Sequence, residues 1–128
     1  MNMKQELERV RNNAYSPYYN FTVGAVLITK NGIQYTGCNI ETITQGPGIC
    51  AERVAFSRAI ADGVREFDKI YIMGGPKDKE AINITPCGVC RQFLVEFCEP
   101  DFKIINYYGN NQEKEYLLKD LLPESFKK

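Results

Sequence analysis

The chain has 128 residues and a mass of 14.6 kDa, a size that fits one domain with a single hydrophobic core. Its composition of 44% hydrophobic and 25% charged residues is typical of globular proteins and excludes a disordered or fibrous chain. The formal net charge of zero, from 16 basic and 16 acidic residues, argues against a broadly basic nucleic-acid-binding protein. We therefore expect a single domain over residues 1–128 with no nucleic-acid partner.

Apolar periodicity and turn residues predict helices and strands that alternate along the chain. The Asn31-Gly32 pair between the first two β-rich runs predicts a hairpin with a type I′ turn, and Gly63 is placed to end a helix. The expected elements, in chain order, are a helix over 3–13, strands over 21–29 and 33–40, a helix over 50–62, a strand over 69–73, a helix beginning near 87, a strand over 103–108 and a helix over 115–122. This order predicts an α/β fold, a three-layer α/β/α sandwich with a mixed sheet whose later strands are parallel.

Five cysteines and no histidine are the counts that restrict the chemistry most. The odd number of cysteines, and the mixed charges over residues 1–9 where a secretory signal needs an apolar segment, predict a cytoplasmic protein with free thiols. The longest aliphatic run, 23–28, is far shorter than the ~20 residues of a membrane-spanning helix, so no membrane partner is expected. Without histidine, a metal must be held by thiolate or carboxylate, and proton transfer needs carboxylate, Lys, Tyr or Cys.

Three of the cysteines are predicted to lie where two helices begin. Cys50 precedes one helix, and Cys87 and Cys90 open the next. Free backbone N–H groups and the positive end of the helix dipole favour thiolates at such positions. Because Cys87 and Cys90 are three residues apart, they share a helix face, and Cys50 would complete a set of three zinc ligands. Three protein ligands leave a fourth position open, which is typical of a catalytic zinc site.

Glu52 follows Cys50 by two residues and can reach the open position of such a site. In a chain without histidine, its carboxylate can take a proton from water and return it to a substrate. An acid in the first turn of a helix also stabilises the helix dipole, so Glu52 alone does not indicate catalysis. Its combination with three cysteines favours a catalytic site that holds one zinc ion per subunit.

Two other interpretations of the cysteines stay open. Cys87 and Cys90 form the kind of Cys-x-x-Cys pair found in thiol–disulfide oxidoreductases, although such an enzyme has no need of a third cysteine with a carboxylate two residues beyond it. A non-catalytic zinc module could instead use Cys38 or Cys98 as a fourth ligand.

Five segments together resemble the small, homotetrameric, three-cysteine type of zinc-dependent cytidine deaminase. They occur in the family's order over nearly the whole chain: YSPYYNFTVGA (15–25), GCNIE (37–41), ICAER (49–53), PCGVCRQ (86–92) and LLPESF (121–126). The resemblance implies a cytidine deaminase-like fold and the hydrolytic deamination of cytidine and deoxycytidine to uridine and deoxyuridine, with release of ammonia, in pyrimidine salvage. It further implies attack by a zinc-bound hydroxide, with Glu52 as the proton shuttle.

The resemblance also assigns roles to residues at matching positions. Cys50, Cys87 and Cys90 would hold Zn²⁺. The residues expected to contact the nucleoside are Phe21, Asn39, Glu41, Ala51 and Phe126. Among these, Asn39 and Glu41 would bind the ribose hydroxyls. Phe126 would stack on the base in the pocket of a neighbouring subunit, so the active sites of a homotetramer would lie at subunit interfaces.

Charge arithmetic adds a role for Arg53. Three thiolates and one Zn²⁺ sum to −1, and such a site is a poor Lewis acid unless charge is drawn from the sulfurs. The Arg53 guanidinium, next along the helix from the ligand Cys50, is placed to do so. For Arg91, a role at the site and a surface position are both open.

The chain departs from the family pattern at two places. Gln45, in the loop 42–48, stands where the family carries a tyrosine near the sugar, and the loop 74–85 is longer than in the most compact members. The Gly-Pro element before Cys50 resembles blasticidin S deaminase, so another cytosine-bearing compound is the alternative substrate. Retention of the ribose-binding pair favours an ordinary nucleoside, and a neutral chain without a basic groove disfavours editing of RNA or DNA.

Overall fold

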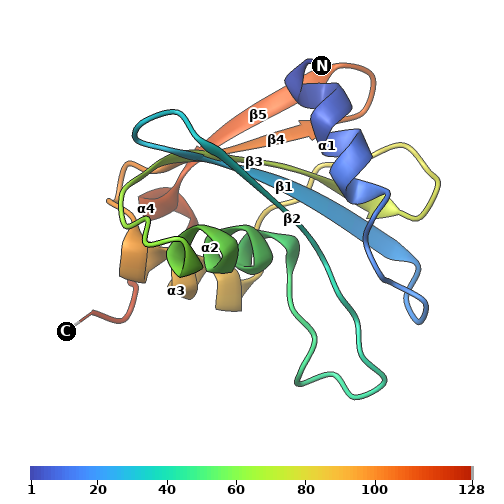
Figure 1. The fold of residues 1–128 in the computed structure, drawn as a ribbon, viewed down its shortest axis with the longest axis horizontal. Coiled ribbons are helices and arrows are strands. Elements are labelled where there is room, and N and C mark those ends of the chain that lie inside the picture. The colour runs from blue at the N-terminus through green and yellow to red at the C-terminus, as the bar shows by residue number, and fades with distance from the viewer. Residues whose placement is uncertain (128) are drawn as a thin grey trace.

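The computed structural model describes residues 1–127, in which five strands form one mixed sheet between two helical layers (Figure 1). In chain order, the elements are α1 (Met3–Arg11), β1 (Phe21–Thr29), β2 (Gln34–Cys38), α2 (Ala51–Ala61), β3 (Phe67–Pro76), α3 (Gly88–Phe97), β4 (Lys103–Tyr108), β5 (Gln112–Leu117) and α4 (Leu118–Leu121). Lys128 lies outside the described residues. Within residues 1–127, no helix has both the length and the apolar character needed to cross a membrane.

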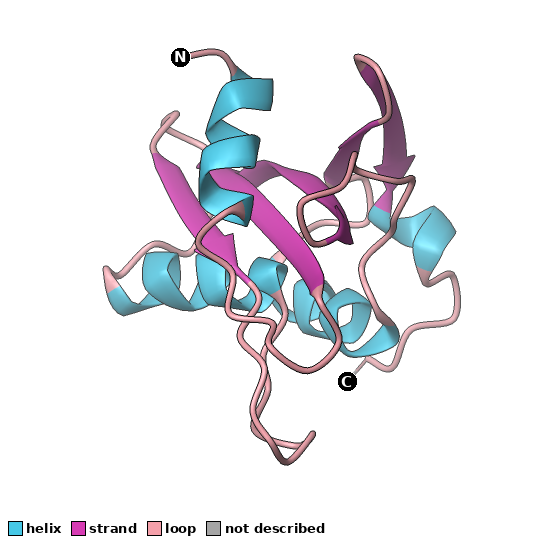
Figure 2. Cartoon of the chain, turned by 90° about the vertical axis from the view of Figure 1, so that its right-hand side faces the viewer, coloured by secondary structure: helices cyan, strands magenta, loops and turns pink. Residues whose placement is uncertain are grey.

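The strand order in the sheet is β2-β1-β3-β4-β5. Neighbouring strands are antiparallel except for β3 and β4, which run parallel and are connected through α3. The mixed sheet and the parallel pairing of the later strands are therefore as predicted. Because β2 and β3 are both antiparallel to β1, they run in the same direction, and the helices that follow them, α2 and α3, begin at the same end of the sheet. The two helices lie next to each other below the sheet (Figure 2).

Apolar side chains along β1 alternate between two cores, one on each face of the sheet. Ala25 and Leu27 belong to the larger core, which α2 and α3 cover with Phe56 and Leu94. Val26 belongs to the smaller core on the face covered by α1. This alternation confirms the predicted α/β/α sandwich.

The hairpin between β1 and β2 has a different turn from the one predicted. Thr29 and Ile33 are joined by a backbone hydrogen bond of 2.9 Å, so three residues connect the strands. Gly32 has a positive φ of 82°, whereas Asn31 does not have the positive φ that a type I′ turn requires. A three-residue loop needs one left-handed residue after a type I turn, and Gly32 supplies it.

The predicted helix over 115–122 is largely wrong. Residues up to Leu117 form β5, which pairs with β4 in an antiparallel hairpin, and only Leu118–Leu121 is helical. Gly109 and Asn111, both with positive φ, reverse the chain directly after β4. The following residues therefore lie beside β4, and the ladder hydrogen bonds outweigh the helix propensity of a Glu- and Lys-rich segment.

Candidate zinc centre and active-site cavity

Cys50, Cys87 and Cys90 come together where α2 and α3 begin. Cys50 is the N-cap residue of α2, Cys87 is the N-cap residue of α3, and Cys90 lies in the first turn of α3. The Sγ atoms of Cys50 and Cys87 are 3.6 Å apart, and the three Sγ atoms all lie within 4.8 Å of one another. Among the described residues, these cysteines form the metal-ligand cluster that the sequence predicts.

The geometry of the three sulfurs fits zinc. Zn–S bonds of about 2.3 Å in tetrahedral geometry place neighbouring sulfurs about 3.8 Å apart. The 3.6 Å between Cys50 and Cys87 is close to this spacing, and within the described chain none of the cysteines is in a disulfide. All three cysteines lie at helix N-termini, where the positive end of the helix dipole favours thiolates. Cys50, Cys87 and Cys90 are therefore the residues that hold zinc.

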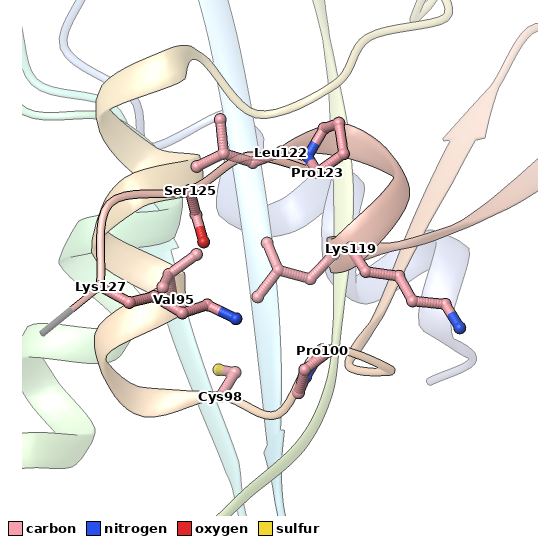
Figure 3. Close-up of a pocket in the computed structure, with 9 residues that line it drawn as sticks. Val95, Cys98, Pro100, Lys119, Leu122, Pro123, Ser125 and Lys127 are labelled. Atoms are coloured by element: carbon pink, nitrogen blue, oxygen red, sulfur yellow. The ribbon is translucent and has the colours of Figure 1, made fainter.

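Neither Cys38 nor Cys98 joins the cluster. Cys98 lines a separate cavity of about 140 Å³ between the end of α3 and α4 (Figure 3). Burial raises the pKa of the Cys98 thiol, and burial likewise raises that of Cys38. Both behave as partly buried, protonated thiols, so the structure does not support a fourth cysteine ligand.

The pKa values of Cys50 and Cys90 shift in opposite directions. A hydrogen bond from the Cys90 thiol, together with those from Arg53 and Cys87, lowers the pKa of Cys50 to about 5 although burial opposes the shift. The pKa of Cys90 is raised, because its proton is held by Cys50 and its sulfur is buried. Zinc binding must therefore displace the proton from Cys90.

Glu52 lies in the first turn of α2, and only 4% of its surface is exposed. Burial raises the pKa of its carboxyl group to about 7, and the charge on Cys50 adds to the shift while the Glu52 backbone N–H and Arg53 oppose it. A carboxyl group that titrates near neutral pH can both accept and return a proton at that pH. Glu52 is therefore suited to general acid–base chemistry.

Arg53 directs its guanidinium toward the cluster. Its Nη2 atom lies 3.7 Å from the Cys50 sulfur, which it approaches as a donor. Within the described residues, its Nε atom is buried and has no hydrogen-bond partner. The placement next to Cys50 agrees with the expected role in drawing charge from the sulfurs.

A cavity of about 410 Å³ lies beside the cluster. It brings together residues singled out from the sequence with others that were not, and its lining consists of Phe21, Val23, Asn39, Cys50, Ala51, Glu52, Ile84, Thr85 and Cys87. Reasoning from the sequence missed Ile84 and Thr85, whose one signal is their position directly before the motif PCGVC. A pocket of this size, with a buried carboxyl group in its wall, can take a small organic molecule.

The Asn39 side chain is bonded to the backbone of β1. Its Nδ2 donates to the carbonyl of Phe21 at 2.9 Å, and its Oδ1 accepts from the Val23 N–H at 2.8 Å. Asn39 thus fixes the stretch of β1 that lines the cavity, a positioning role that the sequence did not indicate.

Glu41 faces a second hollow of about 460 Å³, which shares Asn39 and Cys50 with the first. It accepts hydrogen bonds from Ser16 Oγ at 2.7 Å and from the Tyr18 and Tyr19 N–H groups at 2.9 and 3.2 Å. Burial alone would raise the pKa of Glu41, but these three bonds lower it. Gln45 lines the same hollow and donates to the Tyr19 hydroxyl at 2.6 Å.

Phe126 does not reach the cavity of its own chain. Its ring is 79% exposed, and its backbone is held by Gln92, which accepts from the Phe126 N–H at 3.2 Å and donates to its carbonyl at 3.0 Å. The expected contact with a base is therefore not made within one chain.

Three thiolates at two helix starts, with a buried carboxyl group in the adjoining cavity, define a zinc-dependent hydrolase as the class of enzyme. A model of the "Cytidine and deoxycytidylate deaminase zinc-binding region" matches residues 2–106. The chain belongs to this cytidine and deoxycytidylate deaminase family.

Two cytidine deaminases match over most of their length, and a blasticidin-S deaminase matches over a smaller part. The chain is 37% identical to a cytidine deaminase of Sporosarcina psychrophila over 96% of this chain and 88% of that one. It is 38% identical to a cytidine deaminase of Halalkalibacterium halodurans over 95% and 89%. The crystal structure of cytidine deaminase from Burkholderia pseudomallei superposes with a TM-score of 0.84, at 35% identity over 98% of this chain and 100% of that one. A blasticidin-S deaminase of Bacillus cereus is 30% identical over 68% of this chain and 65% of that one.

Proposed function

We propose that this protein hydrolyses the 4-amino group of cytidine and deoxycytidine, giving uridine or deoxyuridine and ammonia for pyrimidine salvage. The observation that carries the proposal is Glu52, buried in the wall of the 410 Å³ cavity beside three converging cysteine sulfurs. Relatives named cytidine deaminase, which match over 88% and 89% of their own length, support the choice of substrate.

Glu52 would move the protons of the reaction. When bound by Cys50, Cys87 and Cys90, zinc supplies a Lewis acid that lowers the pKa of a water molecule. The Glu52 carboxylate takes a proton from this water and delivers it to N3 of the cytosine ring. Once the water oxygen has bonded to C4, Glu52 would carry the remaining proton of that oxygen to the amino group, whose bond to C4 breaks. One water is thus consumed and one ammonia is released. A pKa of about 7 suits both transfers.

Asn39 and Glu41 keep hydrogen-bonding capacity for a sugar. One N–H of the Asn39 amide is used on Phe21, which leaves the second N–H to donate to a hydroxyl. A carboxylate has about four acceptor positions, and Glu41 uses three of them on Ser16 and the Tyr18 and Tyr19 N–H groups. The remaining position can accept from a ribose hydroxyl. Phe21 and Ala51 would contact the base from the cavity wall.

Arg53 would keep the thiolate-rich zinc an effective Lewis acid. Its guanidinium lies 3.7 Å from the Cys50 sulfur and can withdraw charge from that ligand.

A homotetramer would complete each active site with Phe126 of a neighbouring subunit. Large apolar side chains at the 460 Å³ hollow and in the tail are exposed, and they include Tyr19, Ile40 and Phe126. Such exposed apolar surface is typical of an interface. We further propose that residues 1–128 form one domain, since strands from Phe21 to Leu117 share one sheet, and that the free thiols belong in the reducing cytoplasm.

The alternative substrate is another cytosine-bearing compound such as blasticidin S. The blasticidin-S deaminase relative and the presence of Gln45 in the 460 Å³ hollow favour it. The match to that relative, however, covers a smaller share of this chain and of the relative than the matches to the cytidine deaminases. A thiol–disulfide oxidoreductase is disfavoured, because a dithiol has no use for the third sulfur of Cys50 at 3.6 Å from Cys87.

A panel of cytidine, deoxycytidine, blasticidin S and cytosine, with ammonia release as the readout, tests the proposal. The zinc-loaded protein should release ammonia from the two nucleosides and not from free cytosine. Release from blasticidin S alone would establish the alternative. A protein that is isolated without zinc, reduces disulfides and releases no ammonia would instead be an oxidoreductase.

A further inference from the structure

The segment that connects β3 to α3 carries one zinc ligand and part of the cavity wall. Its last backbone-to-backbone hydrogen bond to the sheet is the one that the Ile82 N–H donates to the Gly74 carbonyl at 2.9 Å. Beyond it, Ile84 and Thr85 line the cavity, and Cys87 begins α3. This segment is neither helix nor strand, so its position depends on other contacts.

Two side chains outside the cavity supply those contacts. The buried Asn106 of β4 accepts the Ile84 N–H on its Oδ1 at 2.7 Å. Arg91 of α3 holds the next two residues: its Nη2 donates to Thr85 Oγ1 at 2.7 Å, and its Nε donates to the Pro86 carbonyl at 2.7 Å. The segment is thus fixed by side chains at three consecutive residues.

The Pro86 carbonyl is the contact with the most direct effect on the zinc ligand. Its carbon is bonded to the nitrogen of Cys87, and the planar peptide unit means that fixing this carbonyl also fixes the start of Cys87. Cys87 is exposed, unlike Cys90, so burial does little to hold it in place. The bond from Arg91 therefore replaces the packing that Cys87 lacks.

A third nitrogen of Arg91 reaches the C-terminal region. Nη1 donates to the Leu121 carbonyl at 2.8 Å, at the end of α4. The planar guanidinium thus bonds to three acceptors through three different nitrogens. A lysine ammonium is a single point of charge and cannot span these acceptors.

We propose that Arg91 is a positioning residue for the zinc site: it holds the Thr85-Pro86 backbone, and thereby Cys87, in the geometry that binds zinc. It acts through the shape of its guanidinium and not through charge on the sulfurs, because its nitrogens are all used on oxygen acceptors. This inference requires zinc on Cys50, Cys87 and Cys90, and it is independent of the substrate.

The test is zinc retention, measured as the rate at which a chromogenic chelator removes zinc from the purified holoprotein. Arg91→Lys and Arg91→Gln should both release zinc about 10- to 100-fold faster, the usual effect of losing a group that orients a metal ligand. Arg65→Gln is the matched control, because Arg65 also donates to backbone carbonyls, those of Ile60 and Val64 near the other end of α2. It should release zinc at the wild-type rate.

Two outcomes would overturn the proposal. Wild-type zinc release in Arg91→Lys, with fast release in Arg91→Gln, would show that charge alone matters. A lowered melting temperature of the metal-free protein without faster zinc release would show a merely structural role.

If the Arg91 variants do not fold, Thr85→Val removes one acceptor and should still speed zinc release about fivefold. An unchanged rate in this variant would also contradict the proposal. Zinc retention that depends on Arg91, in a protein inactive on cytidine, would refute only the proposed substrate.

Discussion

Gly37 of β2 lies in direct backbone contact with Ala51 of α2. A Cβ atom at position 37 would be 2.4 Å from the Ala51 carbonyl oxygen and 2.5 Å from the Ala55 nitrogen, distances too short for real side chains. The absence of a side chain at this position allows the first turn of α2 to lie against the sheet. That turn follows Cys50 and contains Glu52, so this contact determines how close the zinc ligand and the carboxyl group lie to the sheet.

Replacing Gly37 with Ala should push the first turn of α2 away from β2. We expect a decrease of about 1–3 kcal/mol in the free energy of unfolding, as for overpacked cores, together with weaker zinc retention. Urea denaturation and zinc analysis check the two effects. Gly46→Ala is the control, because a Cβ there meets open space and should change stability by less than about 0.5 kcal/mol.

Replacing Glu52 with Gln removes the proposed proton shuttle and keeps the size of the side chain. We expect kcat to fall by about 10²- to 10⁴-fold, the usual range for general acid–base groups, with normal zinc content. Ammonia release and metal analysis on the same sample provide the measurement. Normal turnover in this variant would exclude Glu52 as the proton shuttle.

The stability of the metal-free protein should carry a pH-dependent contribution from Glu52. Because the folded-state pKa is raised from 4.5 to about 7, this contribution is fully present below pH 4.5 and is lost as the pH rises through 7. The shift corresponds to about 3 kcal/mol. Relative to wild type, Glu52→Gln should therefore become more stable as the pH rises from 5 to 8.

Urea denaturation of both proteins in the presence of a chelator measures this difference. The lowered pKa of Cys50 acts in the opposite direction, since its contribution is lost as the pH falls through about 5. Both proteins contain Cys50, so subtraction of the two pH profiles leaves the contribution of Glu52, including its interaction with Cys50. A difference that does not change with pH would contradict the raised pKa.

Replacing Arg53 with Gln should leave the charge on the sulfurs without its counterion. We expect zinc affinity or kcat to fall by about 10- to 100-fold. Arg58→Gln is the matched control on α2, because Arg58 donates to the backbone and side chain of Thr36 and not to a cysteine. Unchanged kinetics and full zinc content in Arg53→Gln would show that Arg53 has no role at the zinc site.

The contribution of Phe126 to a neighbouring subunit can be tested by mixing two defective variants. Phe126→Ala should raise KM for cytidine, since its neighbours lose a stacking partner, and Glu52→Gln should be inactive. When the subunits are exchanged, Glu52→Gln chains would supply Phe126 to sites with an intact Glu52. The mixture should therefore regain affinity for cytidine; the simple average of the separate activities would show that Phe126 acts within its own chain or not at all.

The zinc ligands could be predicted from the sequence because each lies at a helix beginning that local residues specify. Cys50 follows a glycine-rich loop, and Pro86 directly precedes Cys87, so both helix starts are visible without knowledge of the fold. The same locality made the bounds of β1 and β4 predictable, since their apolar runs end at recognisable turn residues.

The missed features depend on partners that are distant along the chain. Strand β5 exists because Gly109 and Asn111 turn it back onto β4, and its own residues favour a helix as readily. The role of Arg91 was left open because one of its three acceptors, Leu121, is 30 residues away. The turn at Asn31 is not the predicted type I′ turn, because Thr29 pairs with Ile33 in the hairpin. This pairing, rather than the Asn-Gly pair, sets the loop length.

The two-way bond between Gln92 and the Phe126 backbone restricts the C-terminal tail within a single chain. Fixing the backbone of one residue costs about 1–2 kcal/mol in conformational entropy. Here that loss occurs during folding of the single chain, because Gln92 holds both the N–H and the carbonyl of Phe126. In the proposed homotetramer, assembly would then carry no additional ordering cost for the backbone of this residue.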